Sequence, residues 1–486
     1  MNVKIKMILT DDDHTEEGKE IQVEIQESIP GDLQNLDEWE HNVHRIGIKS
    51  MQELFKSGIE LHENKVLSEY THKRKRGNNP CHAVKCGFRD FTLRTVFGTE
   101  KGFLRLFLLK LFQSLKVRFP RQRMFCQTCG EWVIPINETL GLHDDDDQER
   151  ATIGFKELCC LHAVHKPYRL AAENAAQVTQ EPEIVSHEQI RQIVQEEGRR
   201  ERAREEEERK DAVFCFVKAL QNKRYYRPVH NGRFYICLDG IHVQSSTGKG
   251  RSHEGKVGFI CTEKRESAGR RLKIPIKRYV SSFESSYILG GRVRGEALRM
   301  AMRVYKEIFI IGDGARWIRK IWLQCFPEAV YILDWYHLRE KLYEALRLTF
   351  PNAGVLRKLI YRRISNHLWR GLKKKALAEL KSLHTQLLLA GKQKRLEQRK
   401  GLQELIEYIQ NNWRGIVNYR KMHKSGYMVA SSLVEKSADL VVAKRQKKRQ
   451  SMHWNKMGAD RLSALRTLWL NGDWEEYWRE RRQKAA

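Results

Sequence analysis

Residues 233–345 alternate apolar runs of strand length with longer helical patterns, and this alternation limits the fold more than any other feature of the sequence. The runs RFYICLDG from Arg233, KVGFICTEK from Lys256 and RLKIPIKRYV from Arg271 predict three consecutive strands separated by turn-rich loops. A helix over 296–305, a strand over 307–315, a second helix, a strand over 330–337 and a third helix from about residue 338 follow. The predicted order β-β-β-α-β-α-β-α indicates an α/β domain.

Three strands that can form a meander, followed by alternating helices and strands, have the element order of the ribonuclease H-like fold. We therefore expect a ribonuclease H-like core, although a fold analogy carries no statement about activity. An all-helical insertion over 346–425 interrupts this core. After it, an amphipathic helix begins near Glu435 and carries Leu440, Val441 and Val442, which can pack on the sheet and aim the carboxylate of Glu435 towards it.

Three aspartates stand at or just beyond the carboxyl ends of the predicted apolar strands: Asp239, Asp313 and Asp334. Sites form at that edge of an α/β sheet, and a carboxylate there needs a cation or hydrogen-bond donors to offset the cost of burial. Converging carboxylates suit Mg²⁺ or Mn²⁺, and two such ions can drive an in-line attack on phosphorus. The alternative is that Asp-Gly after a strand is turn chemistry alone.

Two cysteine pairs precede this core and have the arrangement of a zinc ribbon: Cys81 and Cys86 in CHAVKCG, and Cys126 and Cys129 in CQTCG. Hairpin-compatible sequence that includes RTVFG and GFLRLFLL separates the pairs, and such pairs hold Zn²⁺ tetrahedrally. Ordinary buried cysteines are the alternative. A second group lies in an apolar helical context, where we expect core packing: Cys159, Cys160, His162 and His165.

Residues 168–198 predict two helices with a turn around Glu181 and Pro182 between them. Ser186 followed by Gln189 is a capping-box start for the second helix. One face of this helix is apolar, and the other carries side chains able to reach base edges or phosphates: Gln189, Arg191, Gln192 and Gln195. A helix-turn-helix is the functional interpretation, and a plain helical connector is the alternative. The next run, RRERAREEEERKD, predicts a solvated helix that links two domains.

The positive charge is unevenly distributed along the 486 residues. The chain has 89 Lys and Arg against 61 Asp and Glu, a net +28, yet residues 1–70 carry −9 and the remainder +37. The insertion 346–425 has 19 bases and 4 acids, a net +15, interleaved with aromatic residues: Tyr361, Trp369, Trp413 and Tyr419. Cations with aromatics suit phosphate neutralisation and stacking on unpaired bases, whereas a helix bundle with a solvated basic face is the alternative.

In this basic region we expect DNA contacts from six cations: Arg362, Arg363, Lys373, Lys374, Lys375 and Arg414. Trp454 has two interpretations, stacking on a base or packing in the core. The basic run 73–76 can be read as a nuclear address, but a solvated loop or a phosphate contact is the expectation.

No apolar run approaches the ~18 residues of a membrane span, and no signal-peptide stretch precedes the acids at 11–13. We therefore expect a cytoplasmic, nucleoid-associated protein without membrane contact.

Four motifs resemble bacterial insertion-sequence transposases of the DDE class, closest to the Mutator-like group and its Kra-type and Lre-type families. They are LDG at 238–240, IGDGARWI at 311–318, FPEAVYILDWYH at 326–337 and the stretch 432–466. The resemblance extends over about residues 80–486, because an upstream zinc ribbon and helix-turn-helix are also typical of such proteins. The sequence departs from the pattern where Gly-Ile-His, rather than Gly-Thr, follows Asp239, and where Cys81 and Cys86 are spaced more widely than CxxC.

The resemblance implies roles for five residues. Asp239, Asp313 and Glu435 match the three catalytic acids that hold two Mg²⁺ or Mn²⁺ ions, and Asp334 and His337 match a supporting Asp-x-x-His pair. Without the resemblance, Glu435 is a solvated acid that the helix dipole favours. The implied enzyme cleaves and transfers DNA strands by metal-dependent hydrolysis and transesterification.

The implied partners are double-stranded DNA, both terminal inverted repeats and target, and further copies of the chain in a homodimer or larger synaptic assembly. Two alternatives stay open. One is a structure-specific nuclease or resolvase on the same fold, and the other is a domesticated DNA-binding protein.

These expectations divide the chain into seven segments. They are an acidic helical segment of unknown role (1–76), a zinc-ribbon-like domain (77–135), a helix-turn-helix region (136–198), a charged helical linker (199–230), the first part of the core (231–345), the basic helical insertion (346–425) and the C-terminal helices with the third acid (426–486).

Overall fold

The structure is a computed structural model of the chain, and it forms two compact units. Unit 1 comprises residues 1–194 and 474–486, and unit 2 comprises residues 195–473. The described residues are 2–10, 20–28, 36–69, 72–73, 80–81, 83–94, 117–126, 132–135, 150–179, 183–222, 229–248, 251–263, 265–267, 271–274, 276–389, 396–430, 432–447 and 452–484. None of the helices within these ranges is long and apolar enough to cross a membrane.

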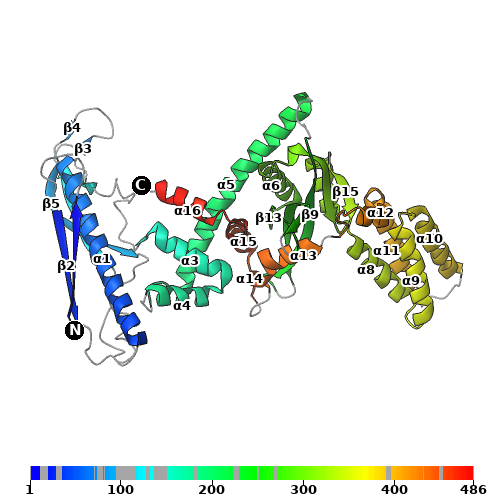
Figure 1. Cartoon of the computed structure of the whole chain (residues 1–486), viewed down its shortest axis with the longest axis horizontal. Coiled ribbons are helices and arrows are strands. Elements are labelled where there is room, and N and C mark those ends of the chain that lie inside the picture. The colour runs from blue at the N-terminus through cyan, green and yellow to red at the C-terminus, as the bar shows by residue number, and fades with distance from the viewer. Residues whose placement is uncertain are drawn as a thin grey trace. The chain divides into compact units, whose positions relative to one another are not determined.

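Unit 1 begins with an antiparallel hairpin of β1 (Asn2–Thr10) and β2 (Glu20–Ser28), followed by the long helix α1 (Leu36–Glu69) (Figure 1). The helix was expected around residues 39–61, whereas the hairpin was not. Short strands β3 (His72–Lys73) and β4 (Pro80–Cys81) pair with each other. A four-stranded sheet has the order β7-β6-β5-β8, from β5 (Ala83–Arg94), β6 (Val117–Cys126), β7 (Trp132–Val133) and β8 (Arg150–Ala151).

Helices complete unit 1. They are α3 (Ile153–His165), α4 (Tyr168–Thr179), the start of α5 (His187–Asn222) and α16 (Trp474–Gln483). Glu157 of α3 accepts hydrogen bonds from the Trp474 indole at 3.2 Å and from Arg482 at 2.6 Å, which ties α16 to α3. The expected core packing of Cys159 and Cys160 is confirmed, because both are fully buried in α3.

Unit 2 contains a five-stranded mixed sheet with the order β13-β10-β9-β14-β15. Its strands are β9 (His230–Gln244), β10 (Ser252–Thr262), β13 (Lys277–Ser282), β14 (Tyr305–Gly312) and β15 (Val330–Leu333). Strand β10 is antiparallel to both of its neighbours, β9 and β13, and β14 lies parallel to both β9 and β15. The predicted α/β class and the order of the elements are confirmed.

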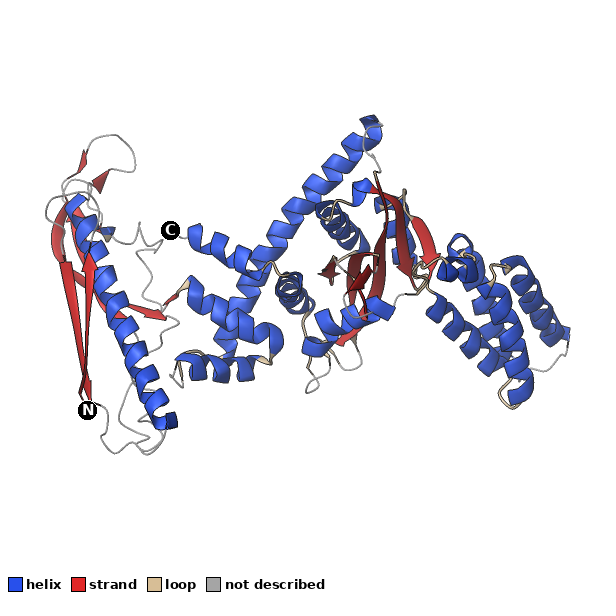
Figure 2. Ribbon diagram, in the orientation of Figure 1, coloured by secondary structure: helices blue, strands red, loops and turns tan. Residues whose placement is uncertain are grey.

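Helices lie on both faces of this sheet (Figure 2). On one face, α6 (Ser286–Arg299) and α7 (Arg316–Cys325) cover a core that includes Phe234, Ile236 and Leu238 of β9. The opposite face is covered by α13 (Ser432–Ala438), a π-helical turn η5 (Asp439–Ala443), α14 (Lys444–Gln446) and α15 (Lys456–Asn471). Side chains alternate along β9, so Asp239 faces this second group of helices.

The long helix α5 continues the charged run 199–211 without a break, and the expectation of a solvated helix is wrong for one face of it. Glu201 is 2% exposed and Arg202 is 8% exposed. The Arg202 guanidinium donates to both carboxylate oxygens of Asp460, at 2.8 and 3.1 Å, and to the Ser463 hydroxyl. The buried charges are paired, which offsets their desolvation.

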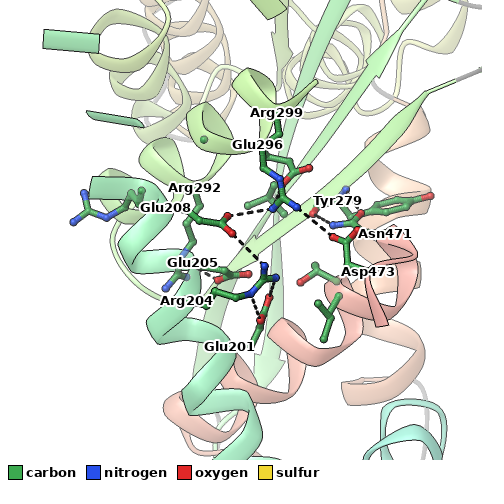
Figure 3. A pocket seen from close by; sticks show the side chains of 15 residues that line it. Glu201, Arg204, Glu205, Glu208, Tyr279, Arg292, Glu296, Arg299, Asn471 and Asp473 are labelled. Carbon is green, nitrogen blue, oxygen red and sulfur yellow. Dashed lines mark hydrogen bonds and ion pairs between the residues drawn. The ribbon is translucent and has the colours of Figure 1, made fainter. Parts of the chain in front are cut away.

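The pairing continues around a pocket formed by α5, α6, β13 and α15 (Figure 3). Arg292 lies 3.3 Å from Glu205 of α5 and 2.9 Å from Glu284. Arg278 of β13 bridges Glu296 and Asp473. This network holds the charged helix against the sheet.

Two predicted boundaries in the core are wrong. The expected third strand over 271–280 is divided into β12 (Arg271–Lys273), which pairs with β11 (Arg265–Ser267), and β13. The helix expected over 296–305 is α6, which starts ten residues earlier behind the Ser285 cap and is followed by a 3₁₀ turn, η2 (Met302–Val304). Gly290 and Gly291 weaken the helical pattern there, and each is needed because a Cβ would lie 2.7 Å from Cys325 Sγ or 2.5 Å from Arg209 Cγ.

The insertion is all-helical in its described residues, as predicted. It contains α8 (Trp335–Thr349), α9 (Gly354–Trp369), α10 (Lys373–Leu389), α11 (Leu396–Asn411), the 3₁₀ turn η4 (Trp413–Gly415) and α12 (Tyr419–Lys424). Trp335, Trp369 and Tyr419 form an aromatic cluster with ring centroids 4.8 to 6.1 Å apart. Tyr419 is fully buried, so the packing alternative describes this aromatic residue.

Candidate active site

The three predicted aspartates follow one another across three adjacent strands. Strand register pairs Gly312 with Leu238 of β9 and with Leu333 of β15. Continuing this register by one residue places Asp313 between Asp239 and Asp334. Side chains alternate along a strand, so Tyr235, Cys237 and Asp239 lie on the same face of β9. The register of the neighbouring strands places Asp313 and Asp334 beside Asp239, on the face of the sheet that α13 covers.

The main chain holds each aspartate in a different way. Asp239 Oδ1 accepts from the Gly240 amide at 2.8 Å, and Asp313 Oδ1 accepts from the Ala315 amide at 2.8 Å. Asp334 is fully buried and caps α8, with its Oδ1 accepting from the His337 amide at 3.0 Å. This cap starts α8 at Trp335, slightly before the expected residue 338.

The placement of Asp239 corrects the prediction that it ends a strand. Strand β9 continues to Gln244 and remains paired with β10 over that length. Asp239 therefore lies inside a strand, opposite Val257, and the turn alternative does not describe it. Asp313, in contrast, does stand in the turn between β14 and α7.

Glu435 reaches the same region from α13, which packs on β9 and β10. Its neighbour Val434 is fully buried, whereas the Glu435 side chain is 53% exposed. Glu435 Oε1 lies 3.7 Å from His337 Nε2, and Glu340 Oε2 lies 3.7 Å from His337 Nδ1. The predicted third acid and the predicted supporting histidine are thus neighbours.

The acids influence one another electrostatically. The pKa of Asp239 is raised to about 6, mainly by burial and also by the negative charges of Asp313 and Glu435, while the Gly240 amide and His337 oppose the increase. A bound cation would favour the ionised form of a carboxyl group that has such neighbours. The arrangement can therefore bind a hard divalent ion through oxygen ligands.

The donor set has the chemistry for Mg²⁺ or Mn²⁺, but it is not gathered around a common point. Among the residues that the structure describes, no three His, Cys, Asp or Glu side chains are close enough together to hold a metal ion. Asp239 lies within β9 and Asp313 in the turn after β14, whereas Glu435 lies on α13 with its side chain 53% exposed.

Two residues of the insertion contact the Asp313 turn, and sequence reasoning missed both. Tyr408 donates its hydroxyl to the Asp313 carbonyl oxygen at 2.6 Å. Asn412 packs against Gly314, whose φ of +89° favours glycine and whose added Cβ would lie 2.8 Å from Asn412 Nδ2. The only sequence signal was the Asp-Gly turn itself.

The predicted DNA-contacting residues fall into two groups. Six have exposed side chains: Gln192, Arg362, Arg363, Lys374, Lys375 and Arg414. Arg363 and the remaining residues contact protein. Arg191 pairs with Glu188 and Arg363 with Glu379, both at 2.5 Å. Lys373 donates to the Trp413 and Ile416 carbonyl oxygens, and burial lowers its pKa.

Within α5, Gln189 closes the predicted capping box by accepting from the Ser186 amide at 2.9 Å. Gln195 donates to the Gly458 carbonyl oxygen at 3.3 Å. Trp454 is 8% exposed, and its indole donates to the Gln446 carbonyl oxygen at 3.1 Å, so the core alternative describes it. The two helices expected at 168–198 are present, whereas Glu181 and Pro182 of the expected turn lie outside the described residues, and the helices do not by themselves establish a helix-turn-helix.

The zinc prediction is tested by little of the described chain. Cys126 is buried at the end of β6 and stands opposite Ala83. Ala83 lies between the two cysteines of the first pair, two residues after Cys81 and three before Cys86. Cys129 lies outside the described residues, as do GFLRLFLL, most of RTVFG and most of the basic run 73–76.

The comparisons with known proteins agree on one family. Residues 111–483 match the Uncharacterised protein family UPF0236. A UPF0236 protein of Caldanaerobacter subterraneus subsp. tengcongensis is 23% identical over 350 residues, which cover 71% of this chain and 64% of the relative. Another from the same organism is 24% identical over 331 residues, covering 67% of this chain and 60% of the relative.

A UPF0236 protein in the vanSb 3′ region of Streptococcus gallolyticus is 26% identical over 359 residues, covering 71% of this chain and 69% of the relative. The chain spans less than two thirds of the length of the Caldanaerobacter relatives that it matches. Because the family match covers more than half of the sequence, this chain belongs to the UPF0236 family.

Proposed function

We propose that this protein is a DDE transposase, a Mg²⁺-dependent enzyme that cleaves and transfers DNA strands at the ends of its own element. The observation that carries the proposal is electrostatic: Asp313 and Glu435, both far from Asp239 in sequence, each raise the pKa of Asp239. Asp334 and His337 border this group on the adjacent strand and helix.

The sheet supports a ribonuclease H-like core. Its order β13-β10-β9-β14-β15 combines an antiparallel meander with two parallel strands, and helices cover both faces. Asp239 lies in β9, and Asp313 and Asp334 follow the parallel strands β14 and β15, a placement suited to action on a phosphodiester.

The chain's own residues would divide the work. Asp239, Asp313 and Glu435 would hold the divalent ions, which supply activation of a water or a 3′-hydroxyl for in-line attack on phosphorus. Asp334 holds the start of α8 and thereby orients His337, and His337 lies beside Glu435. Tyr408 holds the main chain at Asp313.

Charge and copy number also support a DNA enzyme. The insertion carries a net +15, and Arg362, Lys374, Lys375 and Arg414 present exposed cations from it. One Caldanaerobacter relative carries eleven gene designations of a single strain in its name, as the product of a repeated element would.

The proposal is tested with the purified full chain, Mg²⁺ and three DNAs. The first is a fragment that carries the sequences flanking this gene, where the ends of the proposed element lie. The second is the same fragment with those end sequences shuffled, and the third is a four-way junction. We expect cleavage and joining only with the native ends. Nicking of the junction without any need for the ends would favour a resolvase, and end binding without cleavage in Mg²⁺ or Mn²⁺ would favour a DNA-binding protein; either result overturns the proposal.

A further inference from the structure

A groove in unit 2 lies beside the proposed active site and has no role in the account so far. Its volume is about 400 Å³, within the roughly 300–1,000 Å³ of small-ligand sites. It is formed by α7, β15 and the segment 411–415 that joins α11 to η4. We propose that this groove binds one unpaired nucleotide, with the base against its aromatic wall and the phosphate on its cations.

The cations of the groove come from two elements far apart in sequence. Arg316, Arg319 and Lys320 lie on α7, and Arg414 lies on η4. Within the described parts of the chain, no carboxylate forms an ion pair with Arg316, Lys320 or Arg414. The Arg319 guanidinium donates to the Asn411 carbonyl oxygen, which holds it at the groove. Four cations without acids repel one another, so an anionic ligand is favoured there.

One wall of the groove is formed by the half-buried Trp322 ring, and Tyr331, which is 2% exposed, packs against that ring. The rings of Trp322 and Tyr331 stack with centroids 5.2 Å apart and an interplanar angle of 23°. The Trp322 indole donates to the Ala329 carbonyl oxygen at 2.8 Å, which fixes the ring. Leu323 beside them is 57% exposed, an apolar side chain left open to solvent. A nucleobase can stack on the open face of the Trp322 ring.

The groove is also lined by a residue with a buried hydrogen-bond acceptor that lacks a donor. Asn412 lines the groove and is 2% exposed. Its Nδ2 donates to the Tyr408 carbonyl oxygen at 2.9 Å, which fixes the orientation of the amide. Its Oδ1 is buried and accepts no hydrogen bond from any described residue. A buried acceptor without a donor is unfavourable, and the exocyclic amine of a base is a donor that can satisfy it.

The position of the groove explains why a nucleotide would be useful there, and this step rests on the proposed function. Asn412 packs on Gly314, and Tyr408 bonds to Asp313, so the groove shares its wall with the turn that carries an acid. A frayed nucleotide seated in the groove would fix the DNA end relative to Asp313. Cations, an aromatic wall and an unfilled acceptor together match a base with its phosphate better than a free phosphate or a peptide.

The test uses fluorescence of 2-aminopurine, which is quenched when the base stacks. The full chain with Asp239→Asn, in EDTA, is titrated with a duplex that carries a short 2-aminopurine overhang, with a blunt duplex and with 2-aminopurine deoxynucleoside monophosphate. We expect saturable quenching of the overhang. In the same background, Arg316→Ala with Arg414→Ala should weaken it at least tenfold, and Leu323→Asp, at an exposed position, should abolish it.

The matched control is Lys358→Ala with Lys381→Ala, which removes the same charge from exposed helical positions that do not line the groove. Saturable, groove-dependent binding of the monophosphate alone would support the site and identify a free nucleotide as its source. Equal quenching by the Arg316/Arg414 and control variants would overturn the inference. The quenching assay needs no cleavage, so the two proposals can fail separately. A chain that cleaves DNA but shows no groove-dependent quenching overturns only the nucleotide site. A chain that shows the quenching but does not cleave overturns only the proposed function.

Discussion

Tyr408 of helix α11 donates its hydroxyl to the main-chain carbonyl oxygen of Asp313, with the two oxygens 2.6 Å apart. Burial raises the pKa of the Tyr408 phenol far above its ordinary value, so the group stays a proton donor at neutral pH. The bond joins the basic insertion to the turn that carries an acid. The insertion therefore positions the site in addition to contributing positive charge.

Tyr408→Phe tests this positioning. The substitution keeps the ring and removes one hydrogen bond to a buried carbonyl, so we expect a loss of about 1 kcal/mol in the free energy of unfolding. Strand cleavage should slow more than DNA affinity falls. Urea denaturation and single-turnover cleavage measure the two effects, with Tyr343→Phe on exposed α8 as the control. Equal behaviour of the two variants would remove Tyr408 from the positioning role.

Gly314→Ala tests the turn itself. Its φ of +89° is unfavourable for alanine, and the added Cβ would press on Asn412. We expect a loss of more than about 1 kcal/mol in unfolding free energy. Gly354→Ala is the matched control, because its Cβ meets nothing within 4 Å, and it should be neutral or stabilise the protein by up to about 1 kcal/mol. A neutral Gly314→Ala would contradict the described turn.

The pH dependence of stability tests the coupling of the acids. The pKa of Asp239 is raised to about 6, so the folded chain retains a proton that the unfolded chain loses from about pH 4 upwards. The contribution of this group to the unfolding free energy therefore falls as pH rises from about 4 through 6. Asp239→Asn should gain on the order of 1–3 kcal/mol at pH 7 and almost nothing near pH 4, measured by urea denaturation in EDTA. The same gain at both pH values would argue against a perturbed carboxyl.

The buried pair of Arg202 and Asp460 tests how α5 is held. Asp460→Asn removes one of the two acids that pair with the 8%-exposed Arg202 guanidinium and leaves Glu205, so we expect a loss of about 3 kcal/mol, the lower end of the range for a broken buried pair. The exposed pair of Arg200 and Glu196, 2.6 Å apart, is the control, and Glu196→Gln should cost no more than about 0.5 kcal/mol. Similar losses at the two sites would mean that α5 is solvated after all.

The order of the core elements could be predicted because its apolar runs are long and separated by turn residues. Their ends could not be predicted. Strand β9 continues past Asp239 because β10 pairs with it to Gln244, a tertiary effect that the local pattern does not contain. The expected third strand is divided because β12 pairs with β11 whereas β13 pairs with β10, and the local pattern does not contain these partners.

The candidate site was partly predictable for a similar reason. Asp239 and Asp313 follow apolar runs, so local sequence identifies them, but their proximity depends on parallel pairing of β9 with β14. Glu435 was identified only through the resemblance. Tyr408 and Asn412 could not be identified, because they reach the Asp313 turn only through the tertiary placement of α11. The charge pattern of α5 predicted solvent exposure because sequence alone does not show that Asp460 lies opposite Arg202.

The most direct test of the central claim is single-turnover cleavage of DNA carrying the element's ends by Asp239→Asn, Asp313→Asn and Glu435→Gln. Glu475→Gln, an acid in the first turn of α16, is the matched control for Glu435 in the first turn of α13. The account predicts that each of the three variants binds the ends as tightly as the native chain, that each loses cleavage in Mg²⁺, and that the control retains it. Cleavage at the native rate by any of the three would contradict the account.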